Sequence, residues 1–398
     1  MKLMHRLLIL AFLQSFATIF VERGIFFYTT EILEFGKIAN LLLALTFGVF
    51  YVVGALSSHA VSVRYGEKPL LAVALAGQVV FNLALAALPS TPALFVCNAA
   101  LGLLVSLTWP VIESFISAGK TPAQSARAVG AFSISFAVAV PLTLLVSGPV
   151  IDLAGQLLFL IPAAVNAISL FLILPLPMRP KHLPHEHESR PRESEMRRLR
   201  GMLASSRWML LLSYSAMWVL AALMPDILIR RLQIDVAYAA GLSGLLDVCR
   251  LGAFLVLHRW TGWHFRRGPL LAGLVAIQVG FFLVLLGGNL PTVLLGEVLF
   301  GLSAGIIYYS ALYYGMVVTN ASVDAGGKHE GLIGGGFAAG PLIGLAGVSL
   351  VPVFGSTVLA NLVGVEPLLL VCSLAAIRQM QNAFRTSTDA LSPPPPDR

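Results

Sequence analysis

Charged side chains inside long apolar stretches are the residues of this sequence with the clearest potential for chemistry. Glu22 and Arg23 are adjacent, Glu113 stands alone, and Asp247 and Arg250 lie three positions apart. An ionisable group at lipid depth is costly, so it should face a partner or a water-filled cavity. We therefore take these five residues as candidates for the pathway of a solute or an ion.

Each of these candidates also has a plainer interpretation. Glu22 and Arg23 would point about 100° apart on a straight helix and seek different neighbours, unless the helix ends there and leaves both at the interface. Asp247 and Arg250 share a helix face, which suits a structural ion pair as well as a coupling role. Glu113 could line a cavity or lie at the membrane interface.

Aromatic residues offer a second kind of contact. Trp109 and Tyr308 occupy equivalent places in an internal repeat described below, here with an offset of 199, and Tyr309 follows directly. Indole and phenol rings combine an apolar face with a hydrogen-bond donor, which suits a mid-sized organic solute. We add these three to the pathway candidates. Aromatic residues also form belts at membrane interfaces, an interpretation that fits Tyr313 and Tyr314 better.

The composition indicates what surrounds these residues. The 398-residue chain is 57% hydrophobic and 11% charged, against about 25% charged residues in a typical soluble domain. Such a chain cannot cover a soluble surface, so lipid must be its main solvent. The formal charge of +7 comes mostly from basic residues in loops between apolar spans. That pattern is an orientation signal, and we expect no nucleic-acid partner.

Apolar runs predict an all-α integral membrane protein with about twelve transmembrane helices. Residues 1–177 and 208–380 would each form a bundle of six helices. A basic cytoplasmic linker at 178–207 would join the bundles, and a disordered, proline-rich tail would follow at 381–398. The predicted spans are 7–29, 38–62, 69–88, 92–117, 128–152, 156–177, 208–226, 238–258, 269–288, 291–315, 331–353 and 355–377.

Positive charges predict the orientation of these helices. If the N-terminus is inside, the only basic residues of the outer loops are Lys37, Arg230 and Arg231, and the other basic residues of the loops gather on the cytoplasmic side. This asymmetry predicts a multi-pass protein with both termini in the cytoplasm. We expect a monomer in the cell membrane, either the inner or the plasma membrane, with the lipid bilayer as its surroundings.

The two halves of the chain repeat each other. The segment 69–72 reads Pro-Leu-Leu-Ala and returns at 269–272, and Gln78 returns as Gln278 with the same offset of 200. Chance matches of Leu or Ala are common among apolar helices, but Pro and Gln at one spacing are not. An even number of helices in each half makes this a parallel 6+6 repeat, related by an axis along the membrane normal.

With this organisation the chain resembles the major facilitator superfamily of transporters. The family's loop between helices 2 and 3 reads Gly-x-x-x-Asp-Arg-x-Gly-Arg-Lys, and residues 59–68 keep Arg64, Gly66 and Lys68 of that pattern. Val63 replaces the Asp and Glu67 replaces one basic residue, so the family's charge relay lacks its acid here. The resemblance implies a gating role for the three retained residues. It also implies a central cavity lined by helices 1, 4, 7 and 10.

The sequence favours a transporter over an enzyme. It holds no catalytic constellation and no glycine loop for phosphates followed by Lys-Ser or Lys-Thr, so we expect no enzyme activity, no cofactor and no use of ATP. We also expect no metal site, because His182, His185 and His187 alternate with glutamates in a pattern typical of a solvated loop.

The prediction is secondary active transport of a small organic solute by alternating access, with protons as the candidate coupling ion. Two alternatives stay open: a transporter-fold receptor or assembly partner without transport, and a lipid flippase. For proton coupling, Asp247 has Arg250 one turn away and should stay ionised, whereas Glu113 has no basic neighbour within a turn. Arg23 is beside Glu22 but faces elsewhere. We therefore predict Glu22 and Glu113 as the proton carriers.

Overall fold

The computed structural model describes residues 3–120, 122–181, 193–319 and 323–389. The linker histidines and the last nine residues lie outside this described part. Ten of its helices are long and apolar enough to cross a membrane. The pair α14 (Thr357–Gly364) and α15 (Glu366–Asp389), bent by 45°, counts as an eleventh span, and the shorter apolar helix α7 (Leu157–Ile173) supplies a twelfth.

The first six spans form the N-terminal half of the molecule. Its first span is interrupted by a short π-helical turn, a form that is rare and often found at functional sites. The elements are α1 (Leu3–Ile19), η1 (Phe20–Gly24), α2 (Ile25–Glu31), α3 (Lys37–Tyr65), α4 (Glu67–Ala87), α5 (Thr91–Ser117), α6 (Pro122–Ala154) and α7 (Leu157–Ile173).

The last six spans form the C-terminal half and repeat the order of the first. Its first span also ends in a π-helical turn, and its second is divided in two. The elements are α8 (Glu193–Pro225), η3 (Asp226–Arg231), α9 (Val236–Leu242), α10 (Leu245–Arg259), η4 (Thr261–Trp263), α11 (Arg267–Leu286), α12 (Leu290–Thr319), α13 (Val323–Phe354), α14 (Thr357–Gly364) and α15 (Glu366–Asp389).

These helices agree with the twelve predicted spans to within a few residues in most cases, and the larger differences lie at the starts of α6, α8 and α13 and at the end of α15. Residues 193–207 belong to α8 and not to an irregular linker, since only Pro180, Pro184 and Pro191 block a helix there and all three precede Glu193. Residues 381–389 continue α15, so the predicted tail begins later than Gln381. Both corrections have one cause: a helix does not end where its apolar pattern ends.

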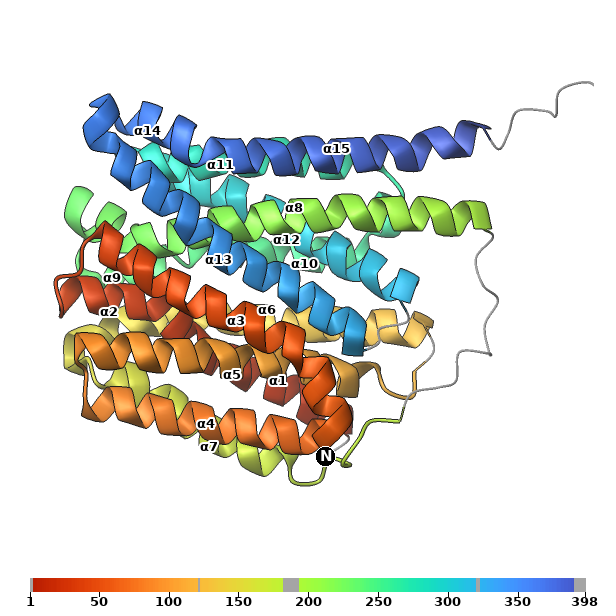
Figure 1. Ribbon diagram of the computed structural model, residues 1–398, viewed down its shortest axis with the longest axis horizontal. Coiled ribbons are helices and arrows are strands. Elements are labelled where there is room, and N and C mark those ends of the chain that lie inside the picture. The colour runs from red at the N-terminus through yellow and green to blue at the C-terminus, as the bar shows by residue number, and fades with distance from the viewer. Residues whose placement is uncertain (1–2, 121, 182–192, 320–322, 390–398) are drawn as a thin grey trace, which may run out of the picture.

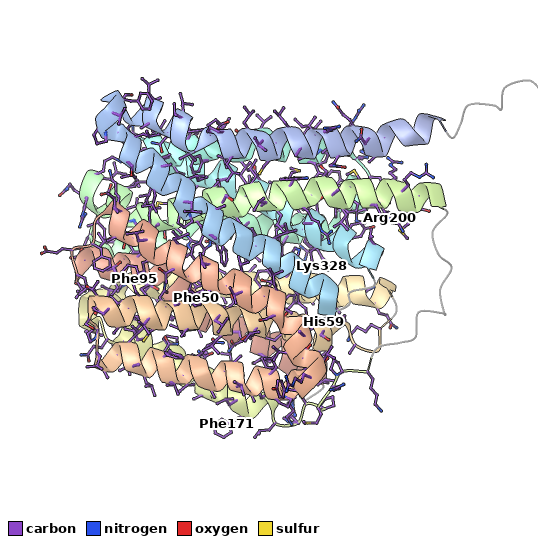
Figure 2. All side chains as sticks on the ribbon, viewed as in Figure 1. Phe50, His59, Phe95, Phe171, Arg200 and Lys328 are labelled. Atoms are coloured by element: carbon purple, nitrogen blue, oxygen red, sulfur yellow. The ribbon has the colours of Figure 1, made fainter. Side chains whose placement is uncertain are left out.

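The bundle has two ends, which Figure 1 shows at its right and left. We call the end where α1 and α8 begin the basic end, and the opposite end, with α2, α9 and α14, the far end. Figure 2 shows Arg200 and Lys328 toward the basic end. It also shows Phe171 pointing away from the bundle, where 71% of the residue is exposed. Exposed apolar side chains of this kind form a surface suited to lipid.

Helix packing follows the internal repeat. Gly102 of α5 lets α3 approach so closely that an added Cβ would lie 2.5 Å from the carbonyl oxygen of Phe47. Gly301 of α12 does the same for α10, where the Cβ would lie 2.1 Å from the carbonyl oxygen of Leu246. Both members of the second pair follow those of the first by 199 residues. The duplicated sequence therefore builds the same helix–helix contact twice.

Helices α3 and α13 form one seam between the halves. An added Cβ at Gly344 would lie 2.7 Å from Leu41 near the far end, and one at Gly331 would lie 3.0 Å from Leu56 toward the basic end. Between these points, a Cβ at Gly48 would lie 2.3 Å from a carbonyl oxygen of α13. This seam is closed over most of its length.

Helix α6 forms the second seam with α9 and α10. An added Cβ at Gly148 would lie 2.4 Å from the carbonyl oxygen of Val236, toward the far end. One at Gly130 would lie 2.5 Å from Nδ1 of His258, toward the basic end. Both seams are therefore tight toward both ends of the bundle.

Candidate functional site

Two interruptions in the helices create the polar centre of the molecule. The π-helical turn η1 carries Glu22 and Arg23, and the break between α9 and α10 falls at Ser243 and Gly244. At that break the backbone N–H of Asp247 donates to the carbonyl of Gly244 (3.0 Å), one residue closer than in a regular α-helix. The carbonyl of Ser243 is thereby left for another donor, and Nη2 of Arg23 supplies it at 2.9 Å.

Asp247 is the centre of a buried network of charges. Its Oδ2 accepts a hydrogen bond from Nη1 of Arg23, which joins α10 of one half to η1 of the other. Its Oδ1 lies 3.8 Å from Nη1 of Arg250 on the same helix. The sequence predicted Arg250 as the partner, and that pair exists, but the closer partner is Arg23. A pairing between residues 224 positions apart cannot be inferred from helix geometry alone.

Arg250 is surrounded by aromatic rings. Its Nη2 donates to the hydroxyl of Tyr214 at 3.1 Å. The guanidinium carbon also lies 4.9 Å from the ring centre of Tyr308, 5.5 Å from that of Phe254 and 5.8 Å from that of Phe136. Such cation–π contacts stabilise a desolvated guanidinium by about 2 kcal/mol in favourable cases. Arg250 is therefore held in place by its own half together with α6.

A central cavity of about 90 Å³ lies against this network, between the two halves. One water molecule requires about 10–15 Å³ of such cavity volume, so the cavity is large enough for several water molecules or a small solute. Both halves contribute charged and aromatic side chains to its wall. These side chains are Glu22, Arg23, Glu113, Asp247, Arg250, Glu330, Tyr51, Trp109, Phe132, Phe136, Tyr214, Trp218, Tyr308 and Phe337.

The carboxylates of the cavity differ in their partners. Glu330 accepts a hydrogen bond from the hydroxyl of Tyr51, which links α13 to α3 across the halves. Glu22 and Glu113 have no hydrogen-bond or ion-pair partner among the described residues. Among the described residues, two of the four acids at the cavity thus have no direct polar partner, and only Asp247 has a countercharge in direct contact.

Of the eight predicted pathway residues, the structure brings seven to the cavity and leaves Tyr309 outside its wall. Trp109 and Tyr308 both contact the ring of Phe136, with centroid distances of 6.0 Å and 5.7 Å. The hydroxyl of Tyr309 instead lies 3.2 Å from Nδ1 of His258, between α12 and α10 toward the basic end.

Sequence reasoning missed several residues of the wall. Tyr51, Tyr214 and Trp218 lie in apolar runs without a nearby charge, so no pattern distinguished them from other core aromatics. Glu330 was missed because the predicted span began at 331, whereas α13 begins at Val323 and carries Glu330 about two turns inside the helix. The acid itself was a usable signal that the wrong boundary concealed.

The predicted gating residues lie at the basic end, in the connection of α3 and α4. Gly66 has φ = 93°, a left-handed conformation that favours glycine. The backbone N–H of Lys68 donates to the carbonyl of Met178 at 3.2 Å, and the guanidinium of Arg64 lies 5.2 Å from the ring centre of Tyr65. The hydrogen bond from Lys68 to Met178 connects the α3–α4 connection to the segment that follows α7, in the same half.

In the described part of the chain, no three or more side chains of His, Cys, Asp or Glu lie together in an arrangement that could bind a metal ion. The predicted solvated loop with His182, His185 and His187 lies outside the described residues. A buried acid that sequence reasoning left without a role is Glu297 of α12. It is fully buried and neither of its carboxylate oxygens has a partner in the described structure.

The fold and this central cavity define a multi-pass helical membrane protein of the transporter type, with two similar halves around a polar centre. The chain belongs to the Major Facilitator Superfamily, whose family model matches residues 7–345. The resemblance inferred from the repeat and the loop motif is thereby confirmed. A comparison with curated protein sequences finds no match.

Solved structures of this fold cover nearly the whole chain. A bacterial homologue of the human lysosomal transporter Spinster, inward-facing and unoccupied, aligns with a TM-score of 0.66 and 14% identity, over 99% of this chain and 98% of its own. The nucleoside transporter NupG aligns with a TM-score of 0.63 and 16% identity, over 99% and 100%. The human organic anion transporter MFSD10 (TETRAN) gives 0.62 and 15%, over 96% and 100%. At these identities the likeness shows the fold.

Proposed function

We propose that this protein is a secondary transporter that moves a small organic solute across the membrane by alternating access of its two halves. The observation that carries the proposal is the cavity of about 90 Å³ between the halves, which is lined by both of them. A polar, aromatic cavity at the junction of two repeats is where a solute would be held during the change of access. Family membership and the transporters among the structural neighbours support the same function.

Two polar bridges between the halves lie on different sides of the cavity and would open in turn. The ion pair of Arg23 with Asp247 is displaced toward the far end, because Arg23 is eight residues before the end of α2. The hydrogen bond of Tyr51 to Glu330 is displaced toward the basic end, because Glu330 follows the start of α13 by seven residues. Access from the far end requires the first bridge to separate, and access from the basic end requires the second.

Protons are the coupling ion in this proposal, and Glu22 and Glu113 carry them. A carboxylate in a closed, largely apolar cavity must bind a proton or a cation to avoid the cost of an isolated buried charge. Neither acid has a cation in direct contact among the described residues, so each can take up a proton in one access state and release it in the other. Asp247 is held by Arg23 and Arg250 and stays ionised.

The orientation and assembly follow the sequence expectation and remain part of the proposal. The basic end faces the cytoplasm, which places both termini, the linker around residues 178–207 and the loop of Arg64, Gly66 and Lys68 on that side. The N-terminal bundle (1–177) and the C-terminal bundle (208–380) move as units in a monomer in the cell membrane.

Transport in proteoliposomes tests the proposal. Purified protein is reconstituted, a proton gradient is imposed in the inward or in the outward direction, and uptake of a broad solute panel is compared with liposomes that lack the protein. We expect saturable uptake of at least one solute, and its accumulation should collapse when a protonophore removes the gradient. Folded protein that gives no saturable uptake with any solute of the panel would refute the proposal.

A lipid flippase is a second candidate because of one further feature. An apolar groove of about 980 Å³ lies between α6 and α9–α10, with Leu145 and Leu245 in its wall and Gln233 and Asp235 at the far end. Such a groove could hold an acyl chain while the polar residues contact a headgroup. Transfer of fluorescent lipid between leaflets, measured in the same proteoliposomes, would distinguish this function from solute uptake.

A further inference from the structure

We propose that the solute is a small organic cation, a protonated amine, which replaces protons on the carboxylates of the central cavity. This inference rests on the proposed transport function and specifies its substrate class.

Acidic side chains outnumber basic ones at the cavity. Its wall carries four carboxylates and two guanidinium groups, and both guanidinium groups are directed at Asp247. This leaves Glu22, Glu113 and Glu330 without an ion-pair partner among the described residues, and only Glu330 has a hydrogen bond, from Tyr51. An occupant with a positive charge would therefore lower the electrostatic cost of the closed cavity, and a negatively charged one would raise it.

An unpartnered hydroxyl marks the place for an ammonium group. Thr18 lies one helical turn before Glu22 and lines the cavity, and only 3% of it is exposed. Its Oγ1 has no hydrogen-bond partner in the described structure, which is costly for a buried polar atom. An ammonium group has three donors, so it can reach the Thr18 hydroxyl and the Glu22 carboxylate together.

Aromatic rings form the rest of the wall and favour the same charge. Trp109 precedes Glu113 by one helical turn, and Trp218 packs on Phe337 with ring centres 4.0 Å apart. The faces of indole and phenyl rings attract cations. An amine with a short apolar chain would thus find a carboxylate for its charge and rings for its carbon atoms.

Arg250 is a poor receptor for an anion, although it lines the cavity. Its guanidinium already contacts Asp247, the hydroxyl of Tyr214 and the surrounding rings. Only its Nε lacks a partner among the described groups, and a single N–H suits one neutral acceptor oxygen on the solute better than a carboxylate, which binds arginine through two nitrogens.

Binding of the amine and of protons is then a competition for the same carboxylates. When an ammonium group reaches protonated Glu22, the carboxyl proton leaves to water and an ammonium–carboxylate pair forms, so one positive charge replaces another. No oxidant, reductant or ATP enters this exchange. The titratable and charged groups that face Glu22 from the surrounding elements are Arg23 of η1, Tyr51 of α3, Tyr214 of α8, Arg250 of α10 and Glu330 of α13.

Binding of matched probes to the purified full-length protein tests the inference. The probes are the series from methylammonium to n-butylammonium, n-butanol, butyrate and the zwitterion 4-aminobutyrate, and binding is followed by calorimetry and by tryptophan fluorescence, since Trp109 and Trp218 line the cavity. We expect the best amine to bind at least about tenfold more tightly than the alcohol or the carboxylate. In weakly buffered solution it should release about one proton for each amine bound.

Variants connect the binding to the proposed groups. Glu22→Gln should weaken amine binding at least about tenfold and abolish the proton release, whereas Glu31→Gln, an exposed acid at the end of the same span, should change neither. Tighter binding of butyrate or 4-aminobutyrate than of every amine would overturn the inference, as would folded protein that binds no amine. These results are independent of transport. Saturable uptake of an uncharged solute would support the proposed transport function and refute the assignment of a cation as the solute. Amine binding without uptake would support a cation site and refute the transport function.

Discussion

Substitution of Asp247 by Asn should destabilise the protein far more than its single position suggests. The aspartate accepts from Arg23 across the halves and lies 3.8 Å from Arg250 on its own helix, so the change removes the countercharge of two arginines. All three side chains are buried, with residue exposures of 2% for Asp247 and 7% for each arginine. The expectation from sequence, that Arg250 alone would be stranded, has to be extended to Arg23.

The magnitude follows from what each arginine retains. Removal of one partner from a buried ion pair costs about 3–5 kcal/mol. Arg23 keeps the carbonyl of Ser243 and Arg250 keeps the hydroxyl of Tyr214 and its rings, so we expect the lower part of this range, about 3 kcal/mol. In Arg23→Gln with Asp247→Asn both charges of the bridge are gone, and we expect about 2 kcal/mol of the loss to be recovered.

Unfolding of the purified protein in detergent measures this double-mutant cycle. The two single variants, the double variant and the wild type are unfolded by heat and by denaturant, with tryptophan fluorescence as the probe. The coupling between residues 23 and 247 equals this recovery plus the loss in Arg23→Gln alone, so a favourable coupling of at least about 2 kcal/mol is expected. If the two single losses add to within about 0.5 kcal/mol, the residues are not coupled and the reasoning is refuted. A double variant as unstable as Asp247→Asn alone would refute it too.

Three further expectations follow from buried groups and close helix contacts. Glu22→Gln or Glu113→Gln should abolish gradient-driven accumulation and leave solute exchange intact at saturating solute, as measured in proteoliposomes; accumulation at the wild-type level in both variants would contradict the proton-carrier proposal. Gly48→Ala should cost about 1–3 kcal/mol of stability, because its Cβ would lie 2.3 Å from a carbonyl oxygen of α13, whereas Gly252→Ala, with open space around it, should be tolerated. Glu297→Gln should preserve or raise the thermal stability at neutral pH, because a buried carboxyl without partners gains nothing from its charge; a marked loss would show that the charge is used.

Much of the fold could be predicted because lipid imposes a simple rule on the sequence. Every backbone polar group within the membrane must be satisfied inside its own segment, so each long apolar run must be a helix. This reasoning placed the spans to within a few residues in most cases. It failed at residues 193–207, 323–330 and 381–389, where helices α8, α13 and α15 continue beyond their apolar runs. Hydrophobicity defines the membrane-spanning part of a helix and not its ends.

Less of the site could be predicted, because its geometry depends on features without a sequence signal. Charge at lipid depth identified Glu22 and Asp247 as residues of interest. The contact of Arg23 with Ser243, however, uses a backbone carbonyl that is free only because the helix breaks there. The bridge from Tyr51 to Glu330 spans 279 positions and depends on how the two halves meet. Helical spacing determines which residues share a face, but it does not determine which faces meet.

The internal repeat nevertheless contains information about the site, in the positions where the halves differ. The shift of 199 residues that relates the contact of Gly102 and Phe47 to its copy also relates Gly48 to Asp247 and Tyr51 to Arg250. In the N-terminal half, position 48 is a glycine that lets α13 approach. In the C-terminal half, the equivalent position is the acid that binds an arginine from the other half. Positions of close helix packing recur in both halves because equivalent pairs of helices pack in each half. The charges occur in only one half because the two halves together enclose a single cavity. A comparison of the two halves for buried positions that are charged in only one of them would therefore have selected Asp247 and Arg250 without a structure, together with Glu297, which the same shift relates to Asn98.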